Sequence, residues 1–246
     1  MRILVKNEIW RPTADFSESL SPFIKAQTKI AVVGSGGKTS IIMQLAEEQK
    51  ALGKKVLVLT TTHMYVPSKY GVVSGIYSDV EKALQTDDIA VVGDKTNDGK
   101  ITWLGDELYK EILPLADIIL IEADGSKRLP LKYPNENEPV IPPEIDIILV
   151  VYGLNAIGKN GNEACHRWAF ARKAFNIANE DETLKPEHLS LLMKEGYLKP
   201  LKTKHPSALV IPLLNQADDK MLEELGKIII DELKTEIGIV SSMLSL

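Results

Sequence analysis

The chain contains 246 residues, and 44% of them are hydrophobic, so it can bury the core of one large α/β domain or of one domain with a small appendage. Its 29 basic and 34 acidic residues give a formal net charge of -5, a balance that argues against general binding to nucleic acid. A single cysteine, Cys165, excludes an intramolecular disulfide, and no apolar run is long enough to cross a bilayer, so we expect a cytoplasmic protein without membrane partners.

Apolar runs and helical patterns alternate from the start of the chain. Residues 16–26 predict a short amphipathic helix, and residues 29–33 predict a buried strand that ends at Gly34. A helix over 39–52 and a second strand over 55–59 follow. The next expected elements are strands at 89–92, 101–104 and 117–121, a hairpin turn at 97–99, and a helix at 107–113.

A long loop with five prolines, residues 125–143, separates these elements from the rest of the chain. A loop of this length inside a compact domain is usually functional or mobile. The later expected elements are strands at 145–151, 208–213 and 237–241 and helices at 165–178, 186–195 and 218–233. Buried strands that alternate with helices predict an α/β fold with a P-loop-like, mostly parallel sheet flanked by helices. Residues 1–246 would form this single domain, with a helical subdomain at about 155–205.

A glycine-rich segment joins the first buried strand to the following helix. Glycines let backbone N–H groups turn toward an anion, and the helix N-terminus adds partial positive charge, so the segment predicts a phosphate-binding loop. Lys38 is expected to contact the β- and γ-phosphates of ATP or GTP, and Thr39 to ligate Mg²⁺. The loop consists of Gly34, Ser35, Gly36, Gly37, Lys38, Thr39 and Ser40.

This loop departs from the full G-x-x-x-x-G-K-[ST] pattern, because Val32 stands where the first glycine would be. It resembles the short G-T-N-G-K-T loop of the Mur ligases, so a short-loop ATP-dependent ligase is one alternative. A dinucleotide-binding loop would need its third glycine at Thr39, and no acidic residue ends the second strand. A glycine-rich turn without a ligand is the remaining alternative.

Two other strand ends carry polar side chains that complement the loop. Thr61, Thr62 and His63 follow the second strand, where hydroxyls can reach magnesium or its waters and the imidazole can transfer a proton. Glu122 and Asp124 follow a later strand and resemble a Walker B segment. The alternatives are threonines that merely favour a strand and acids that are merely solvated. The catalytic candidates are Lys38, Glu122, Asp124 and His63, and the metal candidates are Thr39, Glu122 and Asp124.

Two groups of cations extend the predicted nucleotide site. Lys127, Arg128 and Lys132 lie beside the acidic pair and predict a site for an anionic group, either a phosphate or a substrate, although a solvated loop would have the same composition. His166 and Arg167 begin the helical pattern at 165–178, where arginine suits a phosphate and histidine a proton or a metal. A structural or surface role is the alternative for that second pair.

The segment Leu-Asn-Gln-Ala-Asp at residues 214–218 resembles the N-K-x-D guanine motif of GTPases. Asn215 and Asp218 would contact guanine, whereas Gln216 stands in place of the lysine that packs on the base. The alternative is a helix cap at Asp218, because a helical pattern follows it. The sequence therefore leaves ATP and GTP both open.

Together these segments resemble the YqeC family of selenium-dependent molybdenum hydroxylase accessory proteins. The resemblance implies a nucleotide-binding protein that acts in the maturation of molybdenum hydroxylases, where a labile selenium is installed beside the molybdenum cofactor. A molybdenum hydroxylase client and the molybdenum cofactor itself are the partners that it implies. The segments that carry it, in order, are residues 33–40, 60–63, 122–132, 138–142, 166–167 and 214–218.

Two classes of function fit these features. One is an enzyme that hydrolyses ATP or GTP or transfers a phosphoryl group, with Lys38 and the loop amides stabilising the developing charge. The other is a nucleotide-gated chaperone or carrier of the molybdenum cofactor without turnover of its own. In that case the nucleotide would order residues 125–143 and 155–205 around the client.

Overall fold

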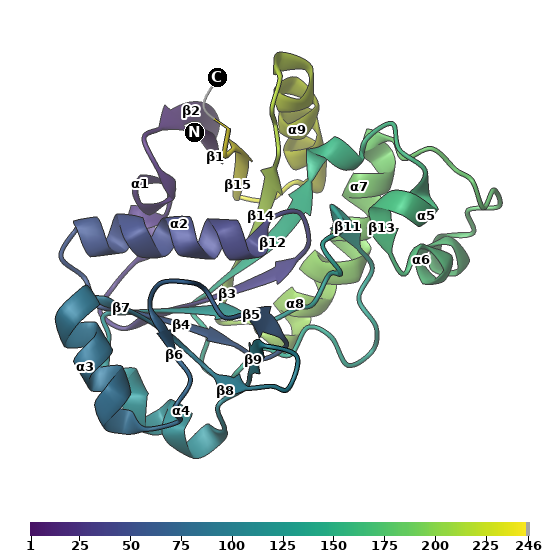
Figure 1. Ribbon diagram of the computed structural model, residues 1–246. Helices are drawn as coiled ribbons and strands as arrows, with labels where there is room; N and C mark the ends of the chain where they lie inside the picture. The colour runs from purple at the N-terminus through teal and green to yellow at the C-terminus, as the bar shows by residue number, and fades with distance from the viewer. Residues whose placement is uncertain (245–246) are drawn as a thin grey trace.

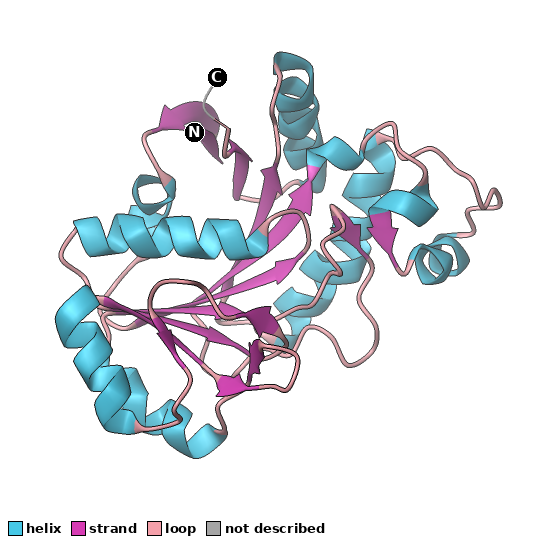
Figure 2. Cartoon of the chain, viewed as in Figure 1, coloured by secondary structure: helices cyan, strands magenta, loops and turns pink. Residues whose placement is uncertain are grey.

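The computed structural model describes residues 1–244, and its centre is one ten-stranded, mostly parallel sheet flanked by helices (Figures 1 and 2). This architecture confirms the predicted fold class. The strands run in the order β2-β1-β15-β14-β12-β3-β10-β4-β7-β6. Their bounds are Arg2–Asn7 (β1), Ile9–Thr13 (β2), Thr28–Gly34 (β3), Val56–Thr60 (β4), Gly71–Val72 (β6), Ile89–Val92 (β7), Ile118–Glu122 (β10), Ile147–Gly153 (β12), Leu209–Asn215 (β14) and Ile237–Ser242 (β15).

Two small sheets accompany the large one. The first pairs β11 with β13 in parallel, and the second is antiparallel in the order β5-β9-β8. The turn between β8 and β9 lies at the predicted hairpin position 97–99. Their bounds are Leu131–Lys132 (β11), Cys165–His166 (β13), Met64–Tyr65 (β5), Lys100–Thr102 (β9) and Asp94–Lys95 (β8).

The central strands are buried on both faces, which explains their continuous apolar sequence. In β3, Ile30 and Val32 belong to one hydrophobic core, whereas Ala31 and Val33 belong to the other. All four side chains are completely buried. A sheet with two apolar faces needs helices on both, because neither face can be left in water.

The helices divide between the two faces. Helices α1 (Phe16–Leu20) and α2 (Lys38–Ala51) contribute to the core around Ile30, and α2 packs there through Ile41 and Leu45. The other core receives side chains from α3 (Tyr77–Asp87), α4 (Asp106–Ile112), α5 (Gly161–Ala164), α6 (Trp168–Phe175), α7 (Pro186–Met193), α8 (Lys199–Lys204) and α9 (Lys220–Leu233).

The helix-rich segment at about 155–205 is continuous with this second core. Its helices α5 to α8 lie together on one side of the molecule in Figure 1, and α7 contacts both α9 and β12. A π-helical turn, Lys194–Leu198, joins α7 to α8 and buries Tyr197. The segment thus has the predicted helical content, and we propose to treat it as part of a single domain because its apolar side chains share the core of the sheet.

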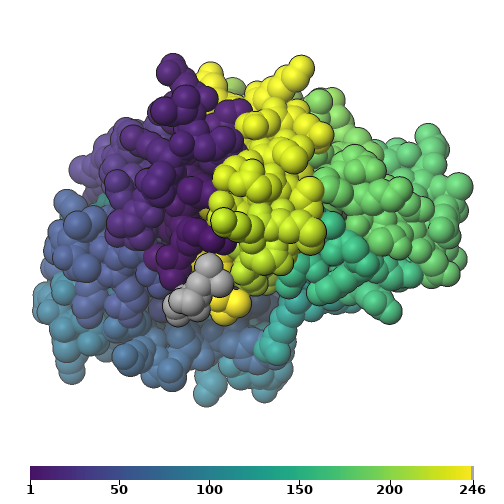
Figure 3. Space-filling view, turned by 90° about the horizontal axis from the view of Figure 1, so that it is seen from above, coloured from purple at the N-terminus to yellow at the C-terminus, as the bar shows by residue number. Residues whose placement is uncertain are grey.

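The N-terminal hairpin β1–β2 lies beside the C-terminal strand, as the purple and yellow regions of Figure 3 show. Strand β1 pairs antiparallel with β15, from Arg2 opposite Ser242 to Asn7 opposite Ile237. Ile3 and Val5 of β1 are buried in one core, and the partly buried Leu4 packs against the other. This hairpin was not predicted, because the short apolar run from Ile3 to Val5 gives only a weak signal.

The start of one helix was predicted wrongly, and another helix was not predicted. Residues Cys165 and His166 form strand β13 instead of starting a helix, because Lys132 of β11 pairs with His166 in a parallel register. Helix α6 begins only at Trp168, after Arg167 in a left-handed conformation. Helix α3 was missed altogether, although Val80 and Leu84 are buried at a helical spacing.

No helix within residues 1–244 is both long and apolar enough to cross a membrane.

Candidate functional site

A cavity of about 720 Å³ opens at the carboxyl ends of the parallel strands. Residues 36–40 line it, and so do residues 125–130. Glu122 at the end of β10, Asn155 in the turn after β12 and Gln216 directly after β14 also line it. This edge of an open α/β sheet is where ligands commonly bind, so the predicted phosphate loop lies in the expected place.

The glycine-rich loop is pressed against the ends of neighbouring strands. Gly34 and Gly36 have φ values of +85° and +84°, and Gly37 has +108°. A Cβ atom on Gly34 would lie 2.3 Å from the carbonyl oxygen of Val151, and one on Gly36 would lie 2.2 Å from the amide nitrogen of Gly153. Both the conformation and the close backbone approach therefore require glycine at these positions.

The loop leaves several backbone donors open to an anion. The amides of Gly34 and Ser35 are already used, by Asp124 at 3.1 Å and by the carbonyl oxygen of Val151 at 2.7 Å. Within residues 1–244 the amides of Gly36 and Gly37 donate to no protein group. Helix α2 has no side-chain cap and no acidic residue in its first turn, so its first amides also lack acceptors. This N-terminus of a 14-residue helix therefore favours a negatively charged ligand.

Lys38 is the buried cation of the loop, with 4% of its surface exposed. Its Nζ donates to the carbonyl oxygen of Gly34 at 3.0 Å and to the hydroxyl of Ser126 at 3.3 Å. Burial lowers the pKa of Lys38, and the nearby Glu122 and Asp124 act in the opposite direction. An incoming phosphate can replace these two neutral acceptors with a charged one, which is a stronger hydrogen-bond partner.

Thr39 and Glu122 are brought together by adjacent strands. The Thr39 hydroxyl donates to Glu122 Oε2 at 2.6 Å, across 83 positions in the sequence. Glu122 is 6% exposed, and burial raises its pKa, although Lys38 and the hydrogen bond from Thr39 lower it in part. The pair offers one hydroxyl and one carboxylate oxygen to the cavity, which is a donor set that suits a hard divalent cation.

Asp124 has a different environment from Glu122. It is fully buried and accepts hydrogen bonds from the Gly34 amide, from the Tyr197 hydroxyl at 2.5 Å and from Lys132. Lys132 is itself fully buried and also donates to the carbonyl oxygen of Gly125 at 2.6 Å. Because protein groups occupy both oxygens of Asp124, the residue connects the phosphate loop to the packed interior and does not line the cavity.

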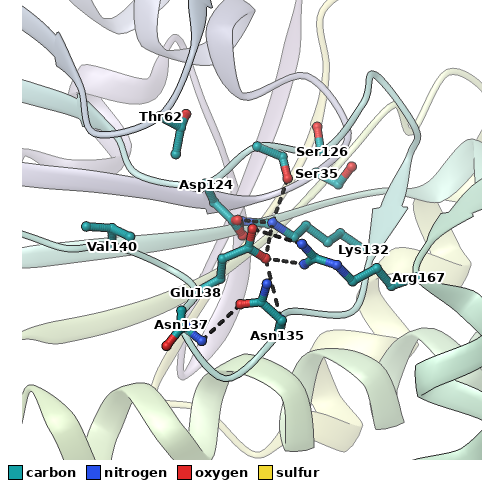
Figure 4. A network of polar contacts seen from close by, with 12 residues as sticks. Ser35, Thr62, Asp124, Ser126, Lys132, Asn135, Asn137, Glu138, Val140 and Arg167 are labelled. Atoms are coloured by element: carbon teal, nitrogen blue, oxygen red, sulfur yellow. Dashed lines mark hydrogen bonds and ion pairs between the residues drawn. The ribbon is translucent and has the colours of Figure 1, made fainter. Parts of the chain in front are cut away.

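The same ionic network fixes the proline-rich loop, as Figure 4 shows. Glu138 pairs with Lys132 at 2.7 Å and with Arg167. Burial would raise the pKa of Glu138, but hydrogen bonds from Arg167 and Lys132 outweigh it and lower the pKa to about 2. Lys132 and Arg167 are thus committed to carboxylates of the protein, and neither lines the cavity.

The residues after β4 differ in whether they line the cavity. His63 lines the cavity and is exposed, whereas Thr61 and Thr62 do not line it. The Thr61 hydroxyl donates to the carbonyl oxygen of Val140 at 2.7 Å, so it holds the proline-rich loop. The hydroxyl oxygens of Thr62 and Thr60 lie 3.3 Å apart.

A basic turn at residues 126–129 forms the rim of the cavity. Lys127 and Arg128 both line the cavity and both adopt left-handed backbone conformations, with φ values of 50° and 61°. Such conformations are uncommon for long side chains and are often kept at functional sites. The turn is tied to the phosphate loop because Ser35 Oγ donates to the carbonyl oxygen of Leu129 and Ser126 accepts from Lys38.

Two residues of this rim were missed at the sequence level. The Arg128 guanidinium lies 4.8 Å from the centre of the Tyr65 ring, and the Lys100 ammonium lies 5.4 Å from it. Tyr65 and Lys100 come from the small β5-β9-β8 sheet and line the cavity. No local pattern predicts them, since their position depends on the pairing of β5 with β9.

The segment after β14 supports the phosphate loop from the other side. Asn215 Nδ2 donates to the carbonyl oxygen of Gly36 at 2.9 Å, and Asn215 Oδ1 accepts from Ser241 at 3.0 Å. Asp218 accepts from Ser242 at 2.6 Å, and the helix cap is Asp219 instead. Neither Asn215 nor Asp218 lines the cavity, whereas Gln216 does.

His166 and Cys165 also differ in their access to the cavity. His166 lines it, with its Nδ1 buried and unpartnered among residues 1–244. Burial lowers the pKa of His166, and the neighbouring Arg167 and Lys132 lower it further. Cys165 is buried, and burial raises the pKa of its thiol to about 12, so it is a poor thiolate nucleophile.

Within residues 1–244, no three His, Cys, Asp or Glu side chains come together as a group that could hold a metal ion. Any cation in the cavity would therefore need ligands from the hydroxyl of Thr39, from Glu122, from water and from a bound phosphate. Magnesium is commonly held in this way, by one or two carboxylates together with substrate phosphates.

The fold and the loop together define an α/β protein with a P-loop-like phosphate loop at the carboxyl edge of a mostly parallel sheet. The chain belongs to the YqeC family, because the family model described as "YqeC protein" matches residues 30–169. A curated relative, "Uncharacterized protein YqeC" of Escherichia coli (strain K12), is 40% identical over 152 residues. That alignment covers 59% of this chain and 59% of the relative's length.

Two solved structures share parts of the fold at low identity. The signal recognition particle receptor FtsY from Elizabethkingia anophelis is 12% identical with a TM-score of 0.39, over 93% of this chain and 65% of that chain. An apo-form GTPase from Pyrococcus abyssi is 13% identical with a TM-score of 0.34, over 82% of this chain and 73% of that chain. These TM-scores are too low for either similarity to bear on ligand or activity.

Proposed function

We propose that this protein binds ATP or GTP with Mg²⁺ and hydrolyses it or transfers its terminal phosphoryl group. The observation that carries the proposal is the 2.6 Å hydrogen bond between Thr39 and Glu122 beside the buried Lys38, at a helix N-terminus whose amides lack acceptors. A phosphate-binding hydroxyl, a strand-end carboxylate and a loop lysine are the parts that recur in P-loop phosphoryl transfer.

The triphosphate would lie along residues 36–40. The open amides and Lys38 would neutralise the β- and γ-phosphates and the charge that grows on them during transfer. Ser40 lines the cavity at the start of the same helix, so it would lie beside these phosphates.

The cation would be held by Thr39 and Glu122. Bound Mg²⁺ would neutralise charge on the β- and γ-phosphates. We assign Asp124 a positioning role instead of the metal-binding role that the sequence suggested, because its oxygens already accept from Gly34, Lys132 and Tyr197. Glu122 would orient the attacking water or acceptor hydroxyl, and the exposed His63 would serve as a second proton acceptor on the rim.

The biological setting that we propose is the maturation of selenium-dependent molybdenum hydroxylases. Membership of the YqeC family supports it. The client hydroxylase, and the molybdenum cofactor as a carried ligand, would meet the protein at residues 125–143 and 155–205, whose contacts converge on Glu138 and Arg167.

Calorimetric titration with non-hydrolysable GTP and ATP analogues and Mg²⁺ tests the nucleotide site. We expect micromolar or tighter binding of one analogue and a loss of at least about tenfold in Lys38→Ala. The exposed Lys110→Ala is the matched control and should bind as the unmodified protein does. If neither analogue binds, or if both lysine variants bind equally well, the triphosphate site is refuted.

A nucleotide-gated carrier without turnover is the second candidate, and one observation favours it. The basic turn is hydrogen-bonded to Ser35 and Lys38, so a phosphate on the loop would change the partners of residues 126–129. Limited proteolysis should then show slower cleavage within residues 125–143 when the analogue and Mg²⁺ are present. An identical cleavage pattern, combined with nucleotide turnover in the presence of the client, would favour the enzyme instead.

A further inference from the structure

We propose that Asn155, His166 and Gln216 form the binding wall for the nucleoside part of the nucleotide, which is its base and ribose. The inference deepens the proposed function and rests on it. The sequence pointed instead to Asn215 and Asp218, whose contacts are taken up by Gly36, Ser241 and Ser242.

The first observation is a cluster of unsatisfied polar atoms. Six buried side-chain atoms within residues 1–244 lack a hydrogen-bond partner, and three of them belong to residues that line this one cavity. These are Asn155 Oδ1, His166 Nδ1 and Gln216 Oε1. Buried polar atoms without partners are rare in native proteins and call for an explanation such as a missing ligand. Their concentration in the cavity points to a ligand that brings N–H and O–H donors.

The second observation is that the backbone holds Gln216 in place. Gln216 has a φ of +63°. Hydrogen bonds hold the residues on both sides of it: Asn215 Nδ2 donates to the carbonyl oxygen of Gly36, and the Ala217 amide donates to the carbonyl oxygen of Ser241. A glutamine kept in an uncommon left-handed conformation with an unpartnered oxygen is a costly arrangement, and such arrangements concentrate at ligand sites.

The third observation places this wall next to the phosphate loop. A Cβ atom on Gly153 would lie 2.1 Å from Gln216 Oε1, and a Cβ atom on Gly36 would lie 2.2 Å from the Gly153 amide nitrogen. The Gln216 carboxamide thus packs on Gly153, which packs on the loop. Asn155 follows two residues after Gly153. A nucleoside attached to phosphates on the loop can therefore reach Gln216 and Asn155, and His166 lines the same cavity.

The fourth observation is the division of charge within the cavity. Asn155 and Gln216 are uncharged, and burial lowers the pKa of His166, which favours its neutral imidazole. Charged side chains also line the cavity, and two of them, Lys127 and Glu138, act on the pKa of His166. Neutral acceptors suit the N–H groups of a base and the hydroxyls of a ribose, whereas the charged groups suit phosphate and metal.

The test compares nucleotides with inorganic tripolyphosphate, which has the phosphates without the nucleoside. Calorimetry with Mg²⁺ is carried out on the full chain and on Asn155→Leu and Gln216→Met, which are close in shape to the native residues. Gln85→Met on the exposed face of α3 is the matched control. We expect each cavity variant to bind the preferred nucleotide about 3- to 10-fold more weakly and tripolyphosphate within about twofold of the unmodified protein.

The outcomes separate this inference from the proposed function. Unchanged nucleotide affinity in both variants, or an equal loss for tripolyphosphate, refutes the nucleoside wall while leaving the phosphate site intact. Tripolyphosphate and nucleotide binding with equal affinity to the unmodified protein also refutes the wall. Absence of binding by every ligand refutes the phosphate site and the wall together.

Thermal melting of the ligand-free variants distinguishes a ligand-binding role of these side chains from a structural role. Because Asn155 Oδ1 and Gln216 Oε1 have no partner among residues 1–244, apolar replacements should keep or raise the melting temperature. A lower melting temperature for both variants, without a selective loss of nucleotide affinity, would show a structural role and overturn the proposal.

Discussion

At the scale of single residues, the site depends on side chains that have little freedom to change. Gly36 needs both a left-handed backbone and space for the Gly153 amide. Lys38 and Glu122 are charged groups held almost out of water, at 4% and 6% exposure. Keeping them charged costs free energy in the empty site, and a polyanion with its cation would recover that cost on binding.

Replacement of Gly36 by alanine should destabilise the protein far more than the same change at Gly53. Both glycines have positive φ values, +84° and +75°, but a Cβ on Gly53 would meet nothing within 4 Å. We expect a loss of about 1 kcal/mol for Gly53→Ala from backbone strain alone, and at least about 3 kcal/mol for Gly36→Ala, where a backbone clash is added. Urea denaturation followed by circular dichroism measures both, and equal losses would contradict the close approach to Gly153.

Replacement of Glu122 by glutamine should stabilise the ligand-free protein while it weakens Mg²⁺-dependent nucleotide binding. Burial raises the folded pKa of Glu122 above its ordinary 4.5, so the unfolded chain loses the proton first and stability falls as the pH rises through the folded pKa. The side chain of Glu122→Gln does not ionise, so this variant does not lose stability in this way as the pH rises. Its melting temperature should therefore exceed that of the unmodified protein at pH 7 and approach it below about pH 4.5.

The exposed Glu236→Gln is the control for this experiment and should follow the unmodified protein at every pH. A melting temperature of Glu122→Gln that is lower at pH 7 would mean that the carboxylate stabilises the empty site, contrary to the direction of its pKa shift.

At the scale of elements, one ionic cluster holds the proline-rich loop (residues 125–143) in place. Lys132 of β11 and Arg167 before α6 both reach Glu138, and Asp124 joins the cluster to the phosphate loop. These contacts link the proline-rich loop, the helix-rich segment and the phosphate loop to one another. Removal of one member of a buried ion pair leaves the other charge without compensation, which is usually costly.

Acid should weaken the protein partly through Glu138. Its pKa falls from 4.5 to about 2 on folding, so its contribution is complete above about pH 4.5 and is lost as the pH falls toward 2. Glu138→Gln should be less stable than the unmodified protein at pH 7, and the difference should shrink between pH 4.5 and 2. Denaturant titrations at several pH values in that range measure the difference in the free energy of unfolding between the two proteins.

Asp98→Asn is the matched control, because hydrogen bonds from Lys100 and Thr96 also lower the pKa of Asp98 to about 2, but Asp98 lies on the exposed surface. Solvent screening makes such surface pairs contribute little, and added salt should abolish what remains. A larger effect at Asp98 than at Glu138 would contradict the importance of the buried cluster.

At the scale of the whole molecule, nucleotide binding should appear as added stability. A ligand at 100 times its dissociation constant adds about 2.7 kcal/mol, which for a chain of this size corresponds to a rise of about 5 to 10 °C in melting temperature. The rise should require Mg²⁺ and should be absent in Lys38→Ala. A rise that persists in that variant would place the nucleotide outside the phosphate loop.

The parts of the structure that could be predicted from sequence are those determined by near neighbours. The buried strands and the phosphate loop follow from continuous apolar runs and from glycines beside Lys38. The different roles of Glu122 and Asp124 could not be predicted, because Asp124 accepts hydrogen bonds from Lys132 and Tyr197, which lie 8 and 73 positions away. Tyr65 joined the rim through pairing of distant short strands, for which no sequence period exists.

The pairing of Arg2 with Ser242 has a consequence for the order of events during synthesis. The hairpin β1–β2 leaves the ribosome well before its partner strand β15, which is translated about 10 to 50 s later at ordinary rates of 5–20 residues per second. Until then the edge of β1 and the apolar side chains of Ile3 and Val5 have no β15 to cover them. A nascent chain stalled before residue 237 would therefore present an open strand edge, which is the kind of surface that chaperones hold and that other chains pair with.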